Sequence, residues 1–337
     1  MENTIRPENI REINCVAIGG GTGLATLLSG LKRYVGPPSS GRHCIAHLSA
    51  IVAVSDDGGS SGRLRDELRM PPPGDIRNCM VALSEDSNLL SRLFQHRFGG
   101  IGELGGHNFG NLFLAALSEI TGDFAEAVKL SSEILASKGH IYPATVSDVR
   151  LAAELFDGSV IRGETRIGNV GRAIKKLYLE PLDCQPMPAA ISAISRAGLI
   201  TIGPGSLYTS LLPPLLVEGV SRAIAQSSAI KVFICNLMTQ PGETDGLTAR
   251  RHLEIVSDYA SEVRFDFLVV NNQPISKIQA ELYEFEGAEQ IGVHGSISSE
   301  TIEGAEIVYG NLLVEGKKVR HDPNKLAQSV LGCSTRG

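Results

Sequence analysis

The sequence predicts an α/β protein of the doubly wound class, with a mainly parallel sheet and helices on both of its faces. Two observations predict this fold. Short apolar segments recur along the chain, and each ends in glycine or small polar residues before a helical pattern begins. These segments are apolar throughout instead of alternating, which is typical of parallel strands covered on both faces.

Five strand-and-helix units follow this pattern. The expected strands are residues 13–18, 44–54, 198–202, 229–235 and 265–270. Each strand runs into a turn rich in Gly, Ser, Thr, Asn or Asp. Ligands of doubly wound sheets bind beyond the carboxyl ends of the strands, near the point where the strand order reverses. We therefore expect the functional residues to lie in these turns.

The middle of the chain departs from the pattern. Residues 109–121 are apolar on nearly every side, which predicts a buried helix. From Val149 onward apolar residues alternate with their neighbours, and Asp157–Gly158 is a hairpin turn signal. We expect residues 138–183 to form a β-rich insertion within a single domain that spans residues 1–337. The length of 337 residues is also compatible with two domains.

The composition argues against several classes of protein. A net charge of −6 argues against a nucleic-acid-binding scaffold. The chain has no long apolar run, so no membrane span is expected, and its N-terminal residues do not resemble a secretory signal. The six cysteines form no CxxC pair, which indicates neither a zinc knuckle nor a redox pair. We expect a cytoplasmic protein, and a homo-oligomer is compatible with the sequence.

Two glycine-rich turns are the first candidates for ligand binding. The first holds Gly20, Gly21, Thr22 and Gly23, and the second holds Gly205 and Ser206. Glycine permits positive φ, so successive backbone N–H groups can converge on an anion at a helix N-terminus. The first turn fits neither the GxGxxG nor the Walker A pattern, and a tight turn that needs glycine for clearance is the alternative. Two such turns at one sheet edge favour a ligand with more than one phosphate.

An acidic turn follows the second strand. Asp56 and Asp57 precede a run of glycines and serines. Adjacent carboxylates at a strand end can hold Mg²⁺, the one candidate cofactor of this sequence, or accept hydrogen bonds from ribose hydroxyls. Helix capping is the alternative that needs no ligand.

Two further turns carry amide and hydroxyl side chains. Asn108 and Asn111 are three residues apart at the start of the buried helix, so they share one face and could bind a base or a sugar. Capping of the helix by Asn108 is the alternative. Asn236 and Thr239 follow the fourth strand in a segment without lysine, which favours recognition of hydroxyls over phosphate.

Together these turns resemble one family, the gluconeogenesis factors (YvcK-type), which are relatives of 2-phospho-L-lactate transferase (CofD). The matching stretches are GGGTG at 19–23, SDDGGSSGRLR at 55–65, PPPGDIRNCMVAL at 71–83, GHNFGN at 106–111, GPGSLYTSLLPPLLVEGV at 203–220, CNLMTQPGETDG at 235–246 and YEFEGAEQI at 283–291. The resemblance covers nearly the whole chain.

The resemblance implies a Rossmann-like fold and a regulator that binds a nucleotide sugar such as UDP-N-acetylglucosamine (UDP-GlcNAc) or UDP-glucose. It further implies a role in cell morphogenesis and peptidoglycan synthesis on gluconeogenic carbon sources, exerted on a cell-wall or morphogenesis protein. Tyr283 and Arg320 match positions that the gluconeogenesis factors use for the UDP-sugar.

The transferase relatives imply a second function. They move a phospholactyl group from a nucleotide-activated donor onto a deazaflavin alcohol, with Mg²⁺, and Asp57 would then be the catalytic contact to the acceptor. Here Asp57 is followed by Gly58 and Gly59, where the transferases carry bulkier residues. This departure favours the regulator, without catalysis, over the enzyme.

Overall fold

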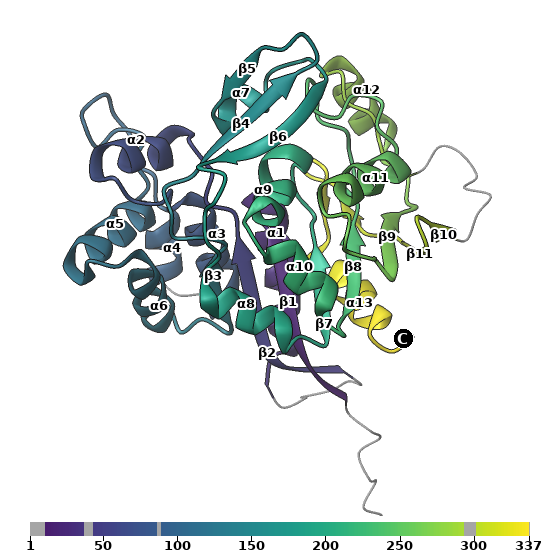
Figure 1. The fold of residues 1–337 in the computed structure, drawn as a ribbon, viewed down its shortest axis with the longest axis horizontal. Helices are drawn as coiled ribbons and strands as arrows, with labels where there is room; N and C mark the ends of the chain where they lie inside the picture. Colours follow the sequence, from purple (N-terminus) through teal and green to yellow (C-terminus); the bar gives the residue numbers. More distant parts are fainter. Residues whose placement is uncertain (1–10, 37–42, 86–88, 293–300, 337) are drawn as a thin grey trace, which may run out of the picture.

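The structure is a computed structural model that describes residues 11–36, 43–85, 89–292 and 301–336. At its centre is an eight-stranded sheet of the order β10-β11-β9-β8-β7-β1-β2-β3, in which only β10 runs antiparallel to its neighbour (Figure 1). Its strands are β1 (Arg11–Gly19), β2 (His43–Val52), β3 (His140–Pro143), β7 (Leu199–Ile202), β8 (Ile230–Ile234), β9 (Phe267–Asn271), β10 (Thr301–Ile302) and β11 (Ala305–Gly310). The predicted α/β class with a mainly parallel sheet is confirmed.

The strand order reverses at β1. The chain runs outward from β1 to β2 and β3 and then returns to β7, which pairs with the other edge of β1. From β7 it continues outward to β8, β9 and β11. This is the Rossmann-like arrangement, and it places the switch point between the carboxyl ends of β1 and β7.

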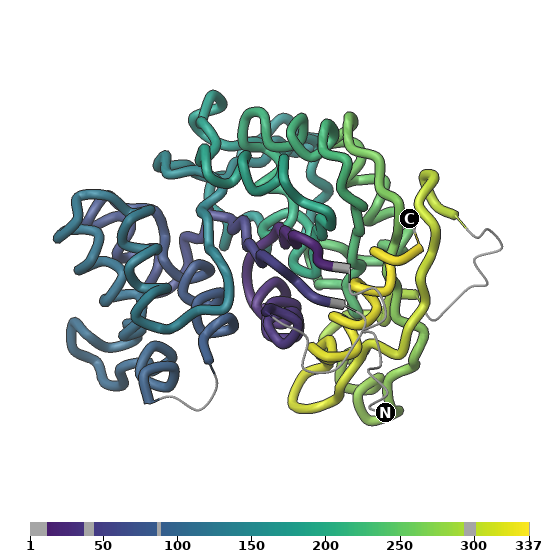
Figure 2. The backbone as a smooth tube through the Cα atoms, turned by 90° about the horizontal axis from the view of Figure 1, so that it is seen from below, coloured from purple at the N-terminus to yellow at the C-terminus, as the bar shows by residue number. Residues whose placement is uncertain are grey.

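Alternate residues of each strand face two separate cores. Val16 and Ile18 of β1 lie in the core on one face, while Cys15 and Ala17 lie in the core on the other. The helices over the first face are α8 (Pro188–Ser195), α9 (Leu212–Leu216), α10 (Val220–Gln226) and α11 (Ala249–Tyr259). Over the second face lie α1 (Gly21–Leu31), α3 (Gly74–Leu83) and α13 (Pro323–Cys333), and Figure 2 shows the two layers from below. Because both faces are covered, the strands can be apolar throughout.

The remaining helices flank the sheet. To one side lie α2 (Gly59–Leu68), α4 (Leu89–Gln95), α5 (Phe109–Thr121) and α6 (Phe124–Ile134). The predicted helix at 109–121 is confirmed as α5 with the same bounds, but the prediction that it is buried is wrong: only one face is buried, at residues such as Leu114 and Ala115, and Ile120 is 78% exposed. Further elements are η1 (Lys32–Tyr34), α12 (Lys277–Phe285), β12 (Leu313–Val314) and β13 (Arg320–His321). In the described parts of the chain, no helix has the length and apolar character needed to cross a membrane.

The insertion is a small antiparallel sheet of the order β5-β4-β6. It contains β4 (Arg150–Leu155), β5 (Val160–Arg162), α7 (Glu164–Ile167) and β6 (Ile174–Glu180), and the predicted turn at Asp157–Gly158 joins β4 to β5. The expected start at residue 138 is too early, because residues 140–143 form β3 and pair with β2 in the main sheet.

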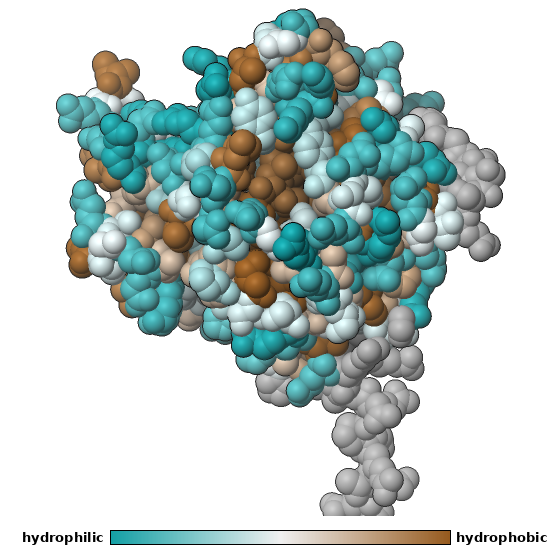
Figure 3. All heavy atoms as spheres, viewed as in Figure 1, coloured by the Kyte–Doolittle hydropathy of each residue, from teal (hydrophilic) through white to brown (hydrophobic). Residues whose placement is uncertain are grey.

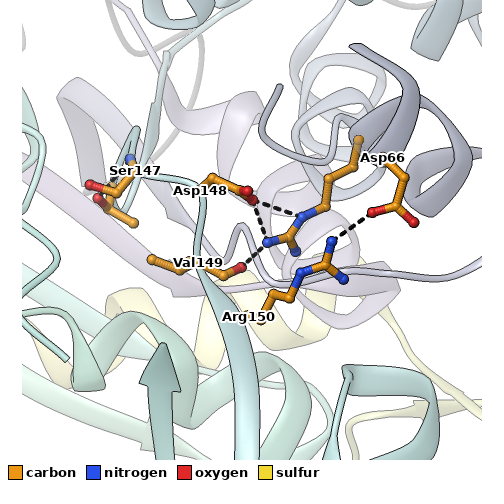
Figure 4. Close-up of polar contacts among 7 residues, drawn as sticks. Asp66, Ser147, Asp148, Val149 and Arg150 are labelled. Carbon is orange, nitrogen blue, oxygen red and sulfur yellow. Dashed lines mark hydrogen bonds and ion pairs between the residues drawn. The ribbon is translucent and has the colours of Figure 1, made fainter. Parts of the chain in front are cut away.

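Two arginine–aspartate pairs join the insertion to α2 (Figure 4). The buried guanidinium of Arg65 lies 2.5 Å from the Asp148 carboxylate and also donates to the carbonyl of Val149. The second pair is exposed and runs the opposite way, from Arg150 on β4 to Asp66 on α2 at 2.6 Å. The insertion is therefore anchored to the helix that follows the acidic turn.

Candidate ligand-binding site at the switch point

A pocket of about 480 Å³ opens at the switch point, between the two glycine turns. This volume lies within the range of about 300–1,000 Å³ that is usual for small-molecule sites. The pocket brings together ten of the fourteen predicted site residues: Gly20, Gly21, Thr22, Gly23, Gly205, Ser206, Asn236, Thr239, Tyr283 and Arg320. The other four, Asp56, Asp57, Asn108 and Asn111, do not line it.

The two glycine turns pack directly against each other. A Cβ atom on Gly23 would lie 2.2 Å from the carbonyl oxygen of Pro204, so only glycine allows the turns to approach this closely. Gly21 has a φ of +63°, which disfavours any residue with a side chain. Glycine is therefore required at position 23 because a side chain would clash with the second turn, and at position 21 because of its backbone conformation.

Asp75 orders the first turn from the side of α3. Its carboxylate accepts a hydrogen bond from the backbone N–H of Gly21, and a Cβ atom on Gly20 would lie 2.6 Å from Asp75 Oδ2. Burial and the neighbouring Asp56 carboxylate raise the pKa of Asp75 to about 7, from 3.8. Asp75 lies in the stretch at 71–83 that resembles the family, but no local pattern relates it to the glycine turn that it orders.

The second turn is held by two side chains from the segment that follows β8. Asn236 accepts from the N–H of Gly205 at 3.0 Å and donates to the carbonyl of the same residue at 2.7 Å. The carboxylate of Glu243 accepts from the Ser206 hydroxyl and, at 3.0 Å, from the backbone N–H of Tyr208. The polar groups of Asn236 and Ser206 are therefore engaged in hydrogen bonds that hold the turn.

Thr239 and Tyr283 hold the opposite wall. Thr239 exchanges two hydrogen bonds of 2.8 Å with the backbone of Glu289. The hydroxyl of Tyr283 accepts from the backbone N–H of Val319 at 2.9 Å. This bond holds the segment that brings Lys318 and Arg320 to the pocket.

Lys318 and Arg320 supply the positive charge of the pocket. Both side chains are exposed, both line the pocket, and neither makes an ion pair with the residues that the structure describes. Lys318 was not predicted, although it lies only two residues before Arg320. His321 adds no charge near neutral pH, because burial lowers its pKa to about 4.

The acidic turn lies behind the first glycine turn and docks the insertion. Asp57 Oδ1 accepts from the N–H and the hydroxyl of Thr165 in α7, at 2.9 and 2.7 Å. The Glu164 carboxyl is hydrogen-bonded to Asp56, and burial together with the Asp56 charge raises the pKa of Glu164. Among the described residues, no group of three or more His, Cys, Asp or Glu side chains is arranged to hold a metal ion.

Asn108 and Asn111 are buried at the start of α5, away from the pocket. Asn108 caps the helix, since its Oδ1 accepts from the N–H of Gly110 at 2.9 Å and its Nδ2 donates to Gln95. Asn111 donates to the hydroxyl of Ser60 at 3.2 Å. The capping alternative for Asn108 is therefore realised, and neither amide is placed to meet a ligand at the switch point.

Comparisons with known proteins point to one family. The family described as 2-phospho-L-lactate transferase CofD matches residues 15–313 of the chain. The gluconeogenesis factor of Halalkalibacterium halodurans is 44% identical over 322 residues, which cover 96% of this chain and 97% of that protein. The gluconeogenesis factor of Bacillus subtilis is also 44% identical, over 314 residues that cover 93% and 95% of the two chains. The crystal structure of a UPF0052 family member from Bacillus halodurans superposes with a TM-score of 0.88 at 44% identity and covers 95% of this chain and 99% of its own.

Proposed function

Since the chain belongs to the CofD family together with the bacterial gluconeogenesis factors, we propose that it is a regulator that binds a nucleotide sugar of the UDP-GlcNAc or UDP-glucose type. The pocket at the switch point is the observation that carries this proposal. At one wall, its glycine turns offer backbone N–H groups other than those of Gly21 and Gly205, which already donate to Asp75 and Asn236. At another wall, Lys318 and Arg320 offer two cations. A diphosphate fits between these walls, because both kinds of group bind phosphate oxygens.

The rest of the pocket suits the neutral parts of such a ligand. Gln240, Asn169 and Glu243 line it and provide amide and carboxylate groups that can bind hydroxyls. In the cell, the bound nucleotide sugar would report on precursor supply during gluconeogenic growth, and the protein would pass this signal to a cell-wall or morphogenesis protein.

Isothermal titration calorimetry tests the ligand. We expect UDP-GlcNAc or UDP-glucose to bind with a micromolar Kd, about −8 kcal/mol, and more tightly than GDP or a deazaflavin alcohol. Arg320→Ala and Lys318→Ala should each weaken binding at least tenfold, while the matched surface variant Arg33→Ala leaves it unchanged. No binding of any UDP-sugar below millimolar concentration would refute the proposal.

Gly21→Val tests the first glycine turn separately. A β-branched residue is strongly disfavoured at a φ of +63°, so the backbone N–H groups of the turn would be displaced and binding lost. Circular dichroism must show a retained fold. If the variant folds and binds normally, the turn does not cradle the phosphates.

The transferase is the second candidate, and one observation favours it: Asp75, which contacts the first glycine turn, interacts electrostatically with the carboxyl groups of Asp56 and Glu164, although these described carboxyl groups are not arranged to hold a metal ion by themselves. The assay incubates the protein with nucleotide-activated phospholactate, a deazaflavin alcohol and Mg²⁺ and measures released nucleotide. Steady release that Asp57→Asn abolishes would establish the enzyme. If no nucleotide is released while UDP-sugars still bind, the transferase is excluded and the regulator remains the proposal.

A further inference from the structure

A second hollow, of about 590 Å³, lies along β6 of the insertion, and we call it the β6 groove. Its floor is apolar and comes from β6, α9 and α11, with Leu179, Leu216 and Ile255 among its lining residues. In Figure 3, apolar surface gathers on this face below the insertion and around α9. At its rim, Phe156 and Leu182 are 73% and 71% exposed. Clustered exposed apolar residues of this kind mark interaction sites on soluble proteins.

The strand that borders the groove has a free edge. Within the described residues, β6 pairs with β4 on one side only, so it is an edge strand of the small sheet. On the other side the N–H of Leu177 points away from β4 and donates to the hydroxyl of Tyr259 at 2.8 Å. A side chain thus occupies a backbone donor that a further strand would use. An edge strand beside an apolar groove is the geometry that binds extended peptides by strand addition.

The charge around the groove selects among such peptides. Lys175, Lys176 and Arg251 line it, against the single acid Asp258, although the whole chain carries a net charge of −6. Lys175 and Arg251 are paired with Glu154 and Glu254, whereas Lys176 has no ion pair in the described part of the chain. A basic rim on an acidic protein favours an acidic occupant.

We propose that the β6 groove binds an extended, acidic segment of a partner protein, which adds to the free edge of β6. Side chains of an added strand alternate, so every second one would enter the apolar floor while the others meet Lys175 and Lys176 at the rim. The segment would replace Tyr259 as the acceptor for the Leu177 N–H.

The β6 groove shares one wall with the ligand pocket. The short π-helix η2 (Leu207–Leu211) follows Ser206, and its Tyr208 side chain lines the β6 groove, whereas Ser210 lines the pocket. Glu243, which lines the pocket, accepts from both Ser206 and the Tyr208 backbone. A ligand that moves Glu243 must therefore move the wall that a partner would touch. This coupling rests on the proposed function, but peptide binding at the groove does not.

A peptide selection tests the groove. Random dodecapeptides displayed on phage are selected on the wild-type protein and counter-selected on the variant Lys176→Glu/Leu182→Glu. Both substitutions are at exposed side chains, so the fold should tolerate them. Binding is then measured by fluorescence with Phe156→Trp, because the chain has no tryptophan of its own. The matched control is Ile120→Glu, which adds a charge at a side chain that is 78% exposed on α5.

We expect the selected peptides to alternate apolar and acidic residues and to protect the amides of residues 174–180 from hydrogen exchange. Lys176→Glu should weaken their binding at least tenfold and Ile120→Glu should not change it. Peptides that lack acidic residues, that leave β6 unprotected, or that bind Lys176→Glu as well as wild type would overturn the proposal, as would a selection that enriches none.

Titration with UDP-GlcNAc tests the coupling. If the two sites are coupled, saturating UDP-GlcNAc changes the Kd of the peptide, and the peptide changes the Kd of UDP-GlcNAc by the same factor. Binding of both with no mutual effect would refute the coupling alone. If UDP-GlcNAc does not bind while the peptides do, the proposed function fails and the groove stands.

Discussion

Asn236 holds the second glycine turn through both ends of its amide. Replacing it by aspartate keeps an acceptor for the N–H of Gly205 but sets a carboxylate oxygen against the carbonyl that Nδ2 now donates to. We expect Asn236→Asp to displace the turn and to weaken nucleotide-sugar binding by about 1–3 kcal/mol, which is a factor of about 5 to 150 in Kd by calorimetry.

Asn14→Asp is the matched control for this change. Asn14 also donates to a backbone carbonyl, that of Arg196 at 3.0 Å, but it lies on β1 outside the pocket. An equal loss of affinity in both variants would mean that the effect of Asn236→Asp is a general loss of stability.

Asp75 makes the stability of the protein depend on pH. Its pKa rises from 3.8 to about 7 on folding, so the folded state holds the proton more tightly than the unfolded state does. The free energy of unfolding should therefore fall between pH 3.8 and about 7, by at most about 1.4 kcal/mol per pH unit, and level off above. Asp75→Asn keeps an acceptor for the Gly21 N–H but cannot ionise. Urea unfolding at pH 5 and pH 7.5 should show the variant gaining stability relative to wild type at the higher pH; a constant difference would contradict this.

The sequence predicted the glycines of the two turns better than the side chains that hold these turns in place. A strand–glycine–helix pattern is local, so Gly20 to Gly23 could be found from the sequence alone. Asp75 and Glu243 reach the two turns, and Lys318 reaches the pocket, only through tertiary contacts, so no local pattern relates these residues to the glycines. Conversely, Asn108 had the right chemistry for a ligand and was used as a helix cap.

The two arginine–aspartate pairs that anchor the insertion to α2 can be tested by mutation. Asp148→Ala leaves the buried guanidinium of Arg65 without its carboxylate, whereas Asp66→Ala removes the acid of the exposed pair with Arg150. Asp148 is itself 52% exposed, so water can replace part of its contribution, and we expect a loss of about 2–3 kcal/mol. For Asp66→Ala the expected loss is below about 1 kcal/mol. Urea unfolding measures the loss of unfolding free energy in both variants. Equal losses would show that the burial of Arg65 does not make its ion pair more important than the exposed one.

Elements with a local signature were predicted well, whereas the short strand β3, which is recognised only by its pairing, was not. The helix at 109–121 and the hairpin at Asp157–Gly158 are encoded in consecutive residues. Residues 140–143 are a short strand whose partner, β2, lies about ninety residues earlier, and four residues cannot show by periodicity which sheet they will join. The expected insertion therefore began too early.

For the whole molecule, ligand binding at the switch point should stabilise the fold. The pocket is built from segments that belong to both halves of the sheet, so a ligand of this pocket would bind only the folded chain. At a ligand concentration of one hundred times Kd the gain is about 2.7 kcal/mol, which for a chain of this size raises the melting temperature by about 4 °C. Differential scanning calorimetry with UDP-GlcNAc should show this shift and Arg320→Ala should lose it at the same ligand concentration. A shift that persists in Arg320→Ala would place the ligand elsewhere.

The position of β1 in the sheet has a consequence for how the protein is made. β1 ends at residue 19, but the neighbour on its second edge, β7, begins only at residue 199. At about 5–20 residues per second, a ribosome needs roughly 10 to 40 s to synthesise the chain between them. During that time an apolar strand keeps one edge unpaired, which is the kind of surface that recruits other strands. The nascent chain should accordingly depend on chaperones that cover β1 until its partner emerges.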